Sequence, residues 1–205
     1  MSAGLREQHK LQTRAAISAV ATRLFAERGF GEVTIAQVAE AAGVAKMTVT
    51  NYFPRKEDLV FDQADAVIGQ LARAAADRAE GESYLTAIRR VYLAELDRED
   101  GAAGIASPGF AAMIRDSPAL IARGAEIAYA RERALGDMIA EAEGTDSPEL
   151  RLVAAQLAAA HRVLYDEAAR LSLAGEPRPR IRAALRLAAE RVFALLEPVI
   201  GSYGT

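Results

Sequence analysis

The chain has 205 residues, a formal net charge of −3, 51% hydrophobic residues and 26% charged residues. These values are typical of a globular protein of one or two domains and exclude an intrinsically disordered chain. No apolar run reaches the roughly 18 residues that a membrane span needs, and the first residues lack the apolar centre of a signal peptide. The sequence has no cysteine, which excludes disulfides and thiol nucleophiles, so we expect a soluble cytoplasmic protein.

The composition favours an all-α fold. The sequence holds 46 alanines, few β-branched or aromatic residues and long stretches without proline, all of which favour helices. The two histidines, His9 and His161, are too few for a histidine-rich metal site. We therefore expect no metal, no cofactor and no catalytic residues.

The charge is unevenly distributed along the chain. Residues 1–56 carry eight Lys and Arg against four acidic residues, a balance of +4, and the remainder carries 17 against 24, a balance of −7. A basic front module joined to an acidic body indicates that only the front meets a polyanion. Charge scatter of this size is also common in proteins that bind no polyanion.

Three helices are expected in the front module. The first spans about residues 8–28 and ends at Gly29, which suits the left-handed turn that often follows a helix. A capping box, in which Thr34 and Gln37 bond to each other's backbone, starts a second, short helix. A third short helix covers about residues 45–52 and stops before a proline.

The second and third helices, joined by a tight glycine-containing turn, predict a helix-turn-helix. In that motif the first helix crosses the DNA backbone and the second enters the major groove. The spacing of Val49 and Phe53 turns both toward the core, which leaves an outward surface rich in hydrogen-bond donors and methyl groups, as duplex DNA requires. This surface comprises Lys46, Met47, Thr48, Thr50, Asn51 and Tyr52, with Lys56 just beyond. The alternative is a three-helix packing unit whose polar face is only solvated.

Two motifs in this region carry a family resemblance. Residues 25–44 read F-x-E-x-G-F-x-x-V-T-I-x-x-V-A-x-x-A-G-V, and residues 52–59 read Y-F-x-x-K-E-x-L. Together they resemble the TetR family of bacterial transcriptional regulators. The resemblance implies an all-α protein with about nine helices. A three-helix DNA-binding domain would span residues 1–55, and a larger helical ligand-binding and dimerisation domain would span residues 56–205.

The resemblance also implies roles for individual residues. Phosphate contacts fall on Thr34, Tyr52 and Lys56, which fix the register on DNA. Base reading falls on Lys46, which can donate to guanine, and on Met47 and Thr50, whose alkyl groups can contact thymine methyls. Thr48 and Asn51 fit either role, and we assign them to phosphate.

The sequence departs from the family at two helix starts. Ala45 and Arg55 stand where relatives commonly place a serine that caps the following helix. Alanine is a poor cap, so we expect the third helix to be loosely held without DNA.

The acidic body is expected to be helical throughout. Ser-Pro pairs at residues 117–118 and 147–148 are start signals, each a cap followed by proline at the first helical position. The expected helices span about residues 56–80, 83–98, 110–115, 118–143, 148–173 and 180–200.

The last two helices are predicted to form a homodimer interface. Two apolar stripes suggest a four-helix bundle made by two helices from each chain, and a two-fold dimer would read a palindromic operator. The alternative is that the stripes only close the core of one chain. They comprise Leu150, Val153, Leu157, Leu164 and Leu171, and Ile181, Leu185, Val192, Leu196 and Val199.

A ligand pocket is predicted among the large, soft or hydrogen-bonding side chains of the body. His161 and Tyr165 share one face of their helix, where they either bind a ligand or form a satisfied core or interface pair. The other positions also occur commonly as plain core. The candidate residues are Phe61, Tyr92, Phe110, Met113, Ile114, Tyr129, Met138, His161 and Tyr165.

The leading hypothesis is a homodimeric repressor that a small-molecule effector releases from a palindromic operator. The first alternative is a DNA-binding protein of chromosome organisation without a small ligand. The second is an all-helical enzyme. Against an enzyme, the sequence has no glycine-rich phosphate loop, no Ser/His/Asp arrangement and no metal-ligand spacing.

Overall fold

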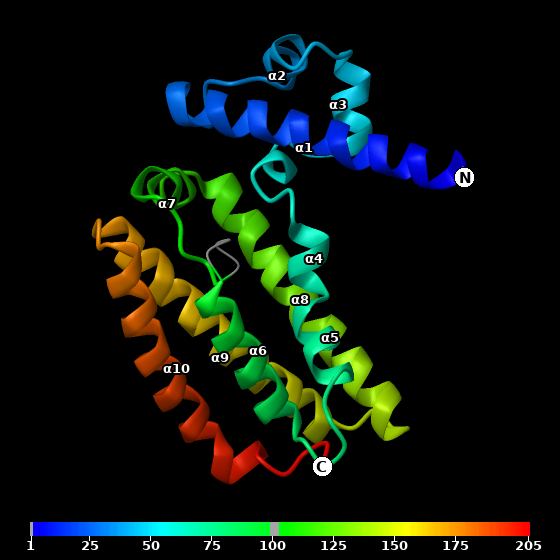
Figure 1. Ribbon diagram of the computed structural model, residues 1–205, viewed down its shortest axis with the longest axis vertical. Helices are drawn as coiled ribbons and strands as arrows, with labels where there is room; N and C mark the ends of the chain where they lie inside the picture. Colours follow the sequence, from blue (N-terminus) through cyan, green and yellow to red (C-terminus); the bar gives the residue numbers. More distant parts are fainter. Residues whose placement is uncertain (1, 99–102) are drawn as a thin grey trace. The chain divides into compact units, whose positions relative to one another are not determined.

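The computed structural model describes residues 2–98 and 103–205, with side chains from Gln8 onward, and all regular elements in these ranges are helical (Figure 1). They comprise ten α-helices and one 3-10 helix, so the expected number of about nine helices is too low. The chain divides into two compact units, Met1–Ala64 with Met113–Gly124, and Asp65–Ala112 with Ala125–Thr205. The all-α class is confirmed, and the domain boundary at residue 55 stays a prediction.

The first unit begins with the long helix α1 (Ser2–Arg28), against which α2 (Ile35–Ala41) and the 3-10 helix η1 (Glu57–Leu59) pack. Helix α3 (Lys46–Tyr52) packs against α2. Apolar side chains from all four elements are fully buried and form the core of the unit: Ile17, Phe25, Val33, Val38, Val49, Phe53 and Leu59.

The corner between α2 and α3 follows the sequence signals. Thr34 Oγ1 accepts a hydrogen bond from the Gln37 backbone amide at 3.3 Å, and Gln37 Oε1 accepts one from the Thr34 amide at 2.8 Å. Gly43 has φ +68°, a left-handed conformation that favours glycine, and it reverses the chain after α2. The predicted capping box is therefore confirmed.

The single helix expected over residues 56–80 is wrong, because the chain forms η1, α4 (Ala64–Ile68) and α5 (Gln70–Ala76) instead. The Arg14 guanidinium donates a hydrogen bond to the Asp62 carbonyl at 2.9 Å. The guanidinium of Arg73, on α5, donates to the carbonyl of Ala66 within α4. Side chains thus occupy backbone acceptors that a continuous helix would use for itself.

The remaining helices are α6 (Tyr84–Asp97), α7 (Pro108–Arg115), α8 (Pro118–Glu143), α9 (Pro148–Leu173) and α10 (Arg178–Ile200). In the second unit α10 packs against α6 and α9, and α5 packs against α6. Ser147 Oγ accepts from the Leu150 amide at 3.3 Å, and Pro148 occupies the first turn of α9, as its start signal predicts.

The apolar stripes of α9 and α10 close the core of the second unit. The fully buried members cannot themselves contact a second chain, and the homodimer through the last two helices stays a prediction. Leu171, Val192 and Leu196 pack against the core, and the fully buried members are Leu150, Val153, Leu157, Leu164, Ile181 and Leu185. Val199 alone among the stripe residues is exposed, over 63% of its surface.

The start of α3 gives a first prediction. Ala45 occupies the N-cap position with extended backbone angles, φ −67° and ψ 146°, and makes no side-chain capping bond. Serine at this position would accept from the amide of Thr48, and we expect Ala45→Ser to raise the free energy of unfolding by about 1 kcal/mol. Urea denaturation measures this gain, and hydrogen exchange measures the protection of α3.

The matched control is Ala36→Ser, an exposed position inside α2 where serine gains no cap and lowers helix propensity slightly. In the unsubstituted protein we expect the amides of α3 to exchange faster than those of α2. Equal protection of the two helices would contradict the loosely held third helix.

Candidate nucleic-acid interface and buried polar cluster

Helix α3 presents most of the residues predicted to meet DNA. Lys46, Met47 and Asn51 are exposed, and the side chain of Met47 has 70% of its surface open to solvent. Thr48, Thr50 and Tyr52 are half-buried along the edges of the helix. Val49 and Phe53 are fully buried, so the helix separates a core face from a polar outer face, as the spacing predicts.

The Thr50 hydroxyl is already occupied within its own helix. Its Oγ1 donates toward the carbonyl of Met47 at 3.1 Å, a common arrangement for threonine inside helices. The methyl group of Thr50 is then the part of the side chain left to contact a base. This agrees with the predicted contact to a thymine methyl, which stays a prediction.

Lys56 has an internal role that the sequence did not reveal. Its ammonium donates to the carbonyl of Phe30 and lies 4.4 Å from the centre of the Phe30 ring. Burial lowers the pKa of Lys56 from its ordinary value. The side chain therefore joins the start of η1 to the turn after α1, and its phosphate contact stays a prediction.

Arg14 was not singled out from the sequence, although it positions the end of α3. Its guanidinium donates to the carbonyl of Tyr52 at 2.7 Å and to that of Asp62 at 2.9 Å, and it lies over the Phe53 ring at 4.4 Å. Ser18, one turn further along α1, donates to the Asp62 carboxylate at 2.7 Å. The sequence did offer one signal for this role: Arg14 and Ser18 are polar residues on the side of α1 that otherwise carries apolar residues.

The nine residues predicted to line a pocket are divided between the two compact units. Phe61, Met113 and Ile114 belong to the first compact unit, and the other six belong to the second. Tyr129 is exposed over 64% of its surface, whereas Tyr92 and His161 are buried, with 1% and 3% exposed. Phe110 and Met138 are half-buried.

Tyr92 on α6 and His161 on α9 form a buried pair. Their ring centroids are 5.6 Å apart and the rings are nearly perpendicular, at 81°. Within the described parts of the chain, the Tyr92 hydroxyl and both imidazole nitrogens have no hydrogen-bond partner. His161 is thus a core residue by burial, and no described residue satisfies its ring nitrogens. Buried polar atoms without partners are rare and are a common feature of sites that receive a ligand or a water molecule.

His161 is held in its neutral form. Burial is the main cause, the positive charge of Arg131 is the second, and together they lower the pKa of His161 from 6.5 to about 3. At neutral pH the ring thus has one donor and one acceptor nitrogen.

Comparison with known proteins supports the resemblance seen in the sequence. Residues 17–62 match the family model described as "Bacterial regulatory proteins, tetR family", which covers α2, α3 and the motifs on either side. The N-terminal region of the chain is thus that of a TetR-family regulator. It is 28% identical to the HTH-type transcriptional regulator TcmR of Streptomyces glaucescens over 148 residues, which make up 70% of this chain and 66% of TcmR. The match thus spans just under two thirds of that relative.

The fold of the chain also matches solved structures over nearly its whole length. Salmonella enterica GusR is similar with a TM-score of 0.56 and 19% identity, over 93% of this chain and 96% of GusR. Thermus thermophilus FadR, a repressor solved in complex with lauroyl-CoA, is similar with a TM-score of 0.52 and 20% identity. That match covers 89% of this chain and 92% of FadR, and at this level of identity both matches show the fold alone.

Among the residues described, no group of three or more His, Asp or Glu is arranged to hold a metal ion. Nor does any helix within these ranges have the length and apolar character needed to cross a bilayer.

The buried histidine predicts a pH dependence of stability. Between pH 6.5 and about 3 the unfolded chain binds a proton at His161 that the folded chain does not, so the free energy of unfolding falls as the pH falls. The expected slope from this residue is up to about 1.4 kcal/mol per pH unit. Urea denaturation at pH 7.5, 6.0 and 5.0 measures it, and His161→Gln should remove it.

The control is His9→Gln, which replaces an exposed imidazole on α1 and should keep the slope of the unsubstituted protein. The same slope in His161→Gln as in the unsubstituted protein would contradict the buried neutral imidazole.

Proposed function

We propose that this TetR-family protein is a sequence-specific transcriptional regulator and not an enzyme. It acts in the cytoplasm as a homodimeric repressor that a small-molecule effector releases from a palindromic operator. The observation that carries the proposal is helix α3, which exposes Lys46, Met47 and Asn51 while Val49 and Phe53 anchor it in the core. This is the arrangement in which a recognition helix enters the major groove.

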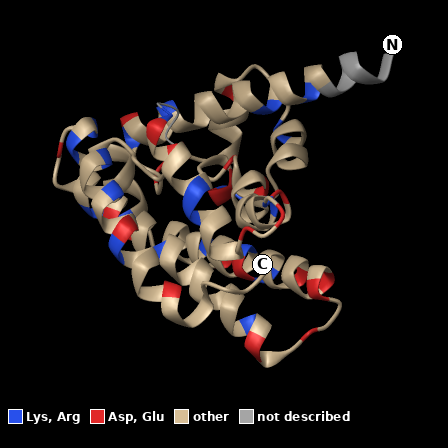
Figure 2. Cartoon of the chain, turned by 60° about the horizontal axis from the view of Figure 1, so that its bottom comes forward, with Lys and Arg blue, Asp and Glu red and all other residues tan. Residues whose placement is uncertain are grey.

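The side chains of α3 suit binding to a polyanion. Its seven residues, Lys46–Tyr52, include one basic residue and no acidic residue. Lysine, asparagine and tyrosine donate to phosphate or base edges, and the alkyl groups of Met47 and Thr50 suit contact with thymine. In Figure 2 acidic and basic residues are both spread along the described helices, so the proposal depends on α3 and not on a concentration of basic residues.

The homodimer interface we propose lies on the outer faces of α9 and α10. These faces expose apolar side chains that the core leaves uncovered: Leu152, Val163, Leu187, Leu195 and Val199. Exposed apolar groups on two adjacent helices favour association, and a two-fold contact would pair the same helices of two chains. Such a dimer would present two copies of α3 to successive grooves of a palindrome.

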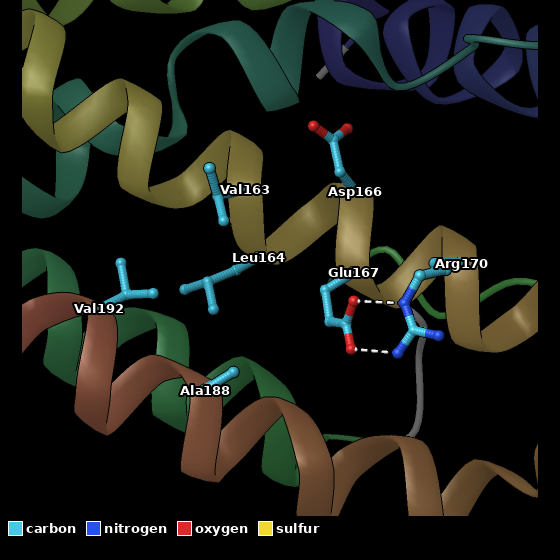
Figure 3. Close-up of a pocket in the computed structure, with 7 residues that line it drawn as sticks. All are labelled: Val163, Leu164, Asp166, Glu167, Arg170, Ala188 and Val192. Atoms are coloured by element: carbon cyan, nitrogen blue, oxygen red, sulfur yellow. Dashed lines mark hydrogen bonds and ion pairs between the residues drawn. The ribbon is translucent and has the colours of Figure 1, made fainter.

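A groove between α9 and α10 supports this surface as a contact region. It encloses about 380 Å³ and has apolar walls from Val163, Leu164, Ala188 and Val192 (Figure 3). At its edge the Glu167 carboxylate accepts two hydrogen bonds from the Arg170 guanidinium, at 2.6 and 2.7 Å. An apolar centre with a polar edge is typical of protein interfaces.

A response to a small molecule is supported by two findings. The FadR structure was solved with lauroyl-CoA bound, and its fold is similar to that of this chain. In this chain the second unit buries Tyr92 and His161 with polar atoms that lack partners in the described residues. A ligand that binds one conformation of this unit more tightly than another would change DNA affinity by linkage.

The deciding experiment is selection of duplexes from a random pool by the purified protein at near-physiological salt. We expect enrichment of a two-fold symmetric motif. Absence of enrichment, in protein shown to be folded and free of co-purified small molecules, would contradict sequence-specific binding. Enrichment of non-symmetric or merely A·T-rich duplexes would favour the alternative, a DNA-binding protein of chromosome organisation.

Two substitutions separate phosphate contacts from base contacts on the selected duplex. Tyr52→Phe removes only a hydroxyl, and we expect it to weaken all duplexes by a similar factor. Lys46→Ala should relax base preference at one position of each half-site, at a cost of about 1–3 kcal/mol. Competition binding against single-base variants of the duplex measures both effects. If neither substitution changed DNA affinity, the assignment of this face of α3 to DNA would be wrong.

The interface gives a further prediction. Leu195 is exposed over 77% of its surface, and Leu195→Glu would place a charge from each chain inside the proposed interface. We expect the molar mass in solution to halve and the affinity for the symmetric duplex to fall by at least about tenfold, as light scattering and binding titration measure. The control is Leu11→Glu on α1, which is exposed over 60%. An unchanged molar mass in Leu195→Glu would place the interface elsewhere.

A further inference from the structure

The second unit contains a buried arginine that forms no ion pair with a described residue. Arg131 on α8 is 5% exposed, and its Nε is buried without a hydrogen-bond partner in the described ranges. Burial lowers the pKa of its guanidinium from the ordinary value, but arginine remains charged in proteins. A buried charge without a partner is strongly unfavourable, so its presence requires an explanation outside the chain's own contacts.

Two further polar groups are placed near this charge. The charge of Arg131 helps to lower the pKa of His161. The Tyr92 ring packs edge to face against the imidazole, with 5.6 Å between the ring centroids. Three helices, α6, α8 and α9, thus supply a guanidinium, an imidazole and a phenol hydroxyl. Each has at least one atom without a partner among the described residues. We call Tyr92, Arg131 and His161 the buried polar cluster.

The surroundings of the cluster limit the charge that a ligand can carry. Asp166 and Glu95 are close enough to influence Arg131 electrostatically, but neither forms an ion pair with it. The Glu95 carboxylate accepts a hydrogen bond from the Gln70 amide and lies 3.9 Å from the Arg98 guanidinium. Asp166 in turn lies 3.7 Å from the Arg162 guanidinium. Each of the two carboxylates thus has another arginine beside it, so Arg131 can balance one negative charge of a ligand but not a second.

The same surroundings define the rest of the ligand. Tyr92 belongs to the apolar core of the second unit, together with Leu96, Leu135 and Leu157. Tyr165, one turn after His161, has 40% of its surface exposed, while burial raises the pKa of its hydroxyl. Tyr165 also acts electrostatically on Arg131, so the cluster lies near a partly exposed side chain.

We propose that Tyr92, Arg131 and His161 bind the carboxylate of an organic monoanion whose remaining body is apolar. The guanidinium can donate two parallel hydrogen bonds to a carboxylate, and the imidazole and phenol can each donate another. Only the identification of this molecule as the effector depends on the proposed function. Binding itself is a property of the second unit.

The first test measures stability without any ligand. Replacing a buried charge that lacks a partner by a side chain of similar size removes a desolvation cost, so Arg131→Met should raise the melting temperature by about 2 °C or more. The matched control on the same helix is Arg123→Met. It removes the ion pair of Arg123 with Asp58, at 2.9 Å, and should lower the melting temperature. A lower melting temperature for Arg131→Met would overturn the proposal, because it would mean that the charge is satisfied within the protein.

The second test uses acetate, hexanoate, octanoate and benzoate, each compared with its neutral primary amide at fixed ionic strength and without DNA. We expect at least one carboxylate with an apolar body to raise the melting temperature of the unsubstituted protein. Its amide should not do so, and the shift should be absent in Arg131→Met and reduced in His161→Phe. If no carboxylate raises the melting temperature, the cluster binds water and the proposal fails. Equal shifts by acid and amide, or a shift retained in Arg131→Met, would also overturn it.

The outcomes for the two proposals are separable. A carboxylate that stabilises the protein through Arg131 but leaves the affinity for the selected duplex unchanged would keep the binding site and reject its role as the effector site. Failure of the duplex selection would reject sequence-specific DNA binding and would leave the melting-temperature result intact.

Discussion

The surface proposed to read DNA depends on tertiary contacts made by helices too short to be stable alone. Helices α2 and α3 have seven residues each, well below the roughly 12–15 residues that an isolated helix needs in water. The buried side chains of Val38, Val49 and Phe53 hold them in place. Arg14 adds two hydrogen bonds, one of them to the last residue of α3. The exposed face of α3 can therefore be rich in polar residues, because its stability comes from the opposite face.

The second unit combines an apolar core with a polar cluster inside it. The buried residues of α10 are all apolar, but α6, α8 and α9 also bury Tyr92, Arg131 and His161. Replacing these three residues by apolar ones would remove the desolvation free energy that the protein loses by burying polar atoms without hydrogen-bond partners. The presence of such atoms in an otherwise well-packed interior is the usual compromise between stability and binding.

The inner and outer apolar residues of α9 and α10 have different roles. The inner stripes of α9 and α10 close the core, whereas Leu152, Leu187 and Leu195 remain exposed on the same helices. A helix with apolar residues on more than one face is expected where it contacts neighbours on more than one side. These outer faces are where we propose that the homodimer forms, and of the ten residues first assigned to the interface Val199 is the exposed one.

The sequence by itself determined the family, the all-α class and the main boundaries of the helix-turn-helix. These depend on local signals, such as the capping box of Thr34 and Gln37, the left-handed Gly43 and the Ser-Pro start of α9, and local signals act within a few residues. Only the tertiary structure decided which apolar faces of α9 and α10 are buried and where the helix expected over residues 56–80 breaks. It showed that Arg14 and Lys56 donate to backbone carbonyls far away in the sequence. It also showed that Arg131 and His161 are buried together. Periodicity defines the faces of one helix, but the neighbour that covers each face is set by contacts between residues far apart in the chain.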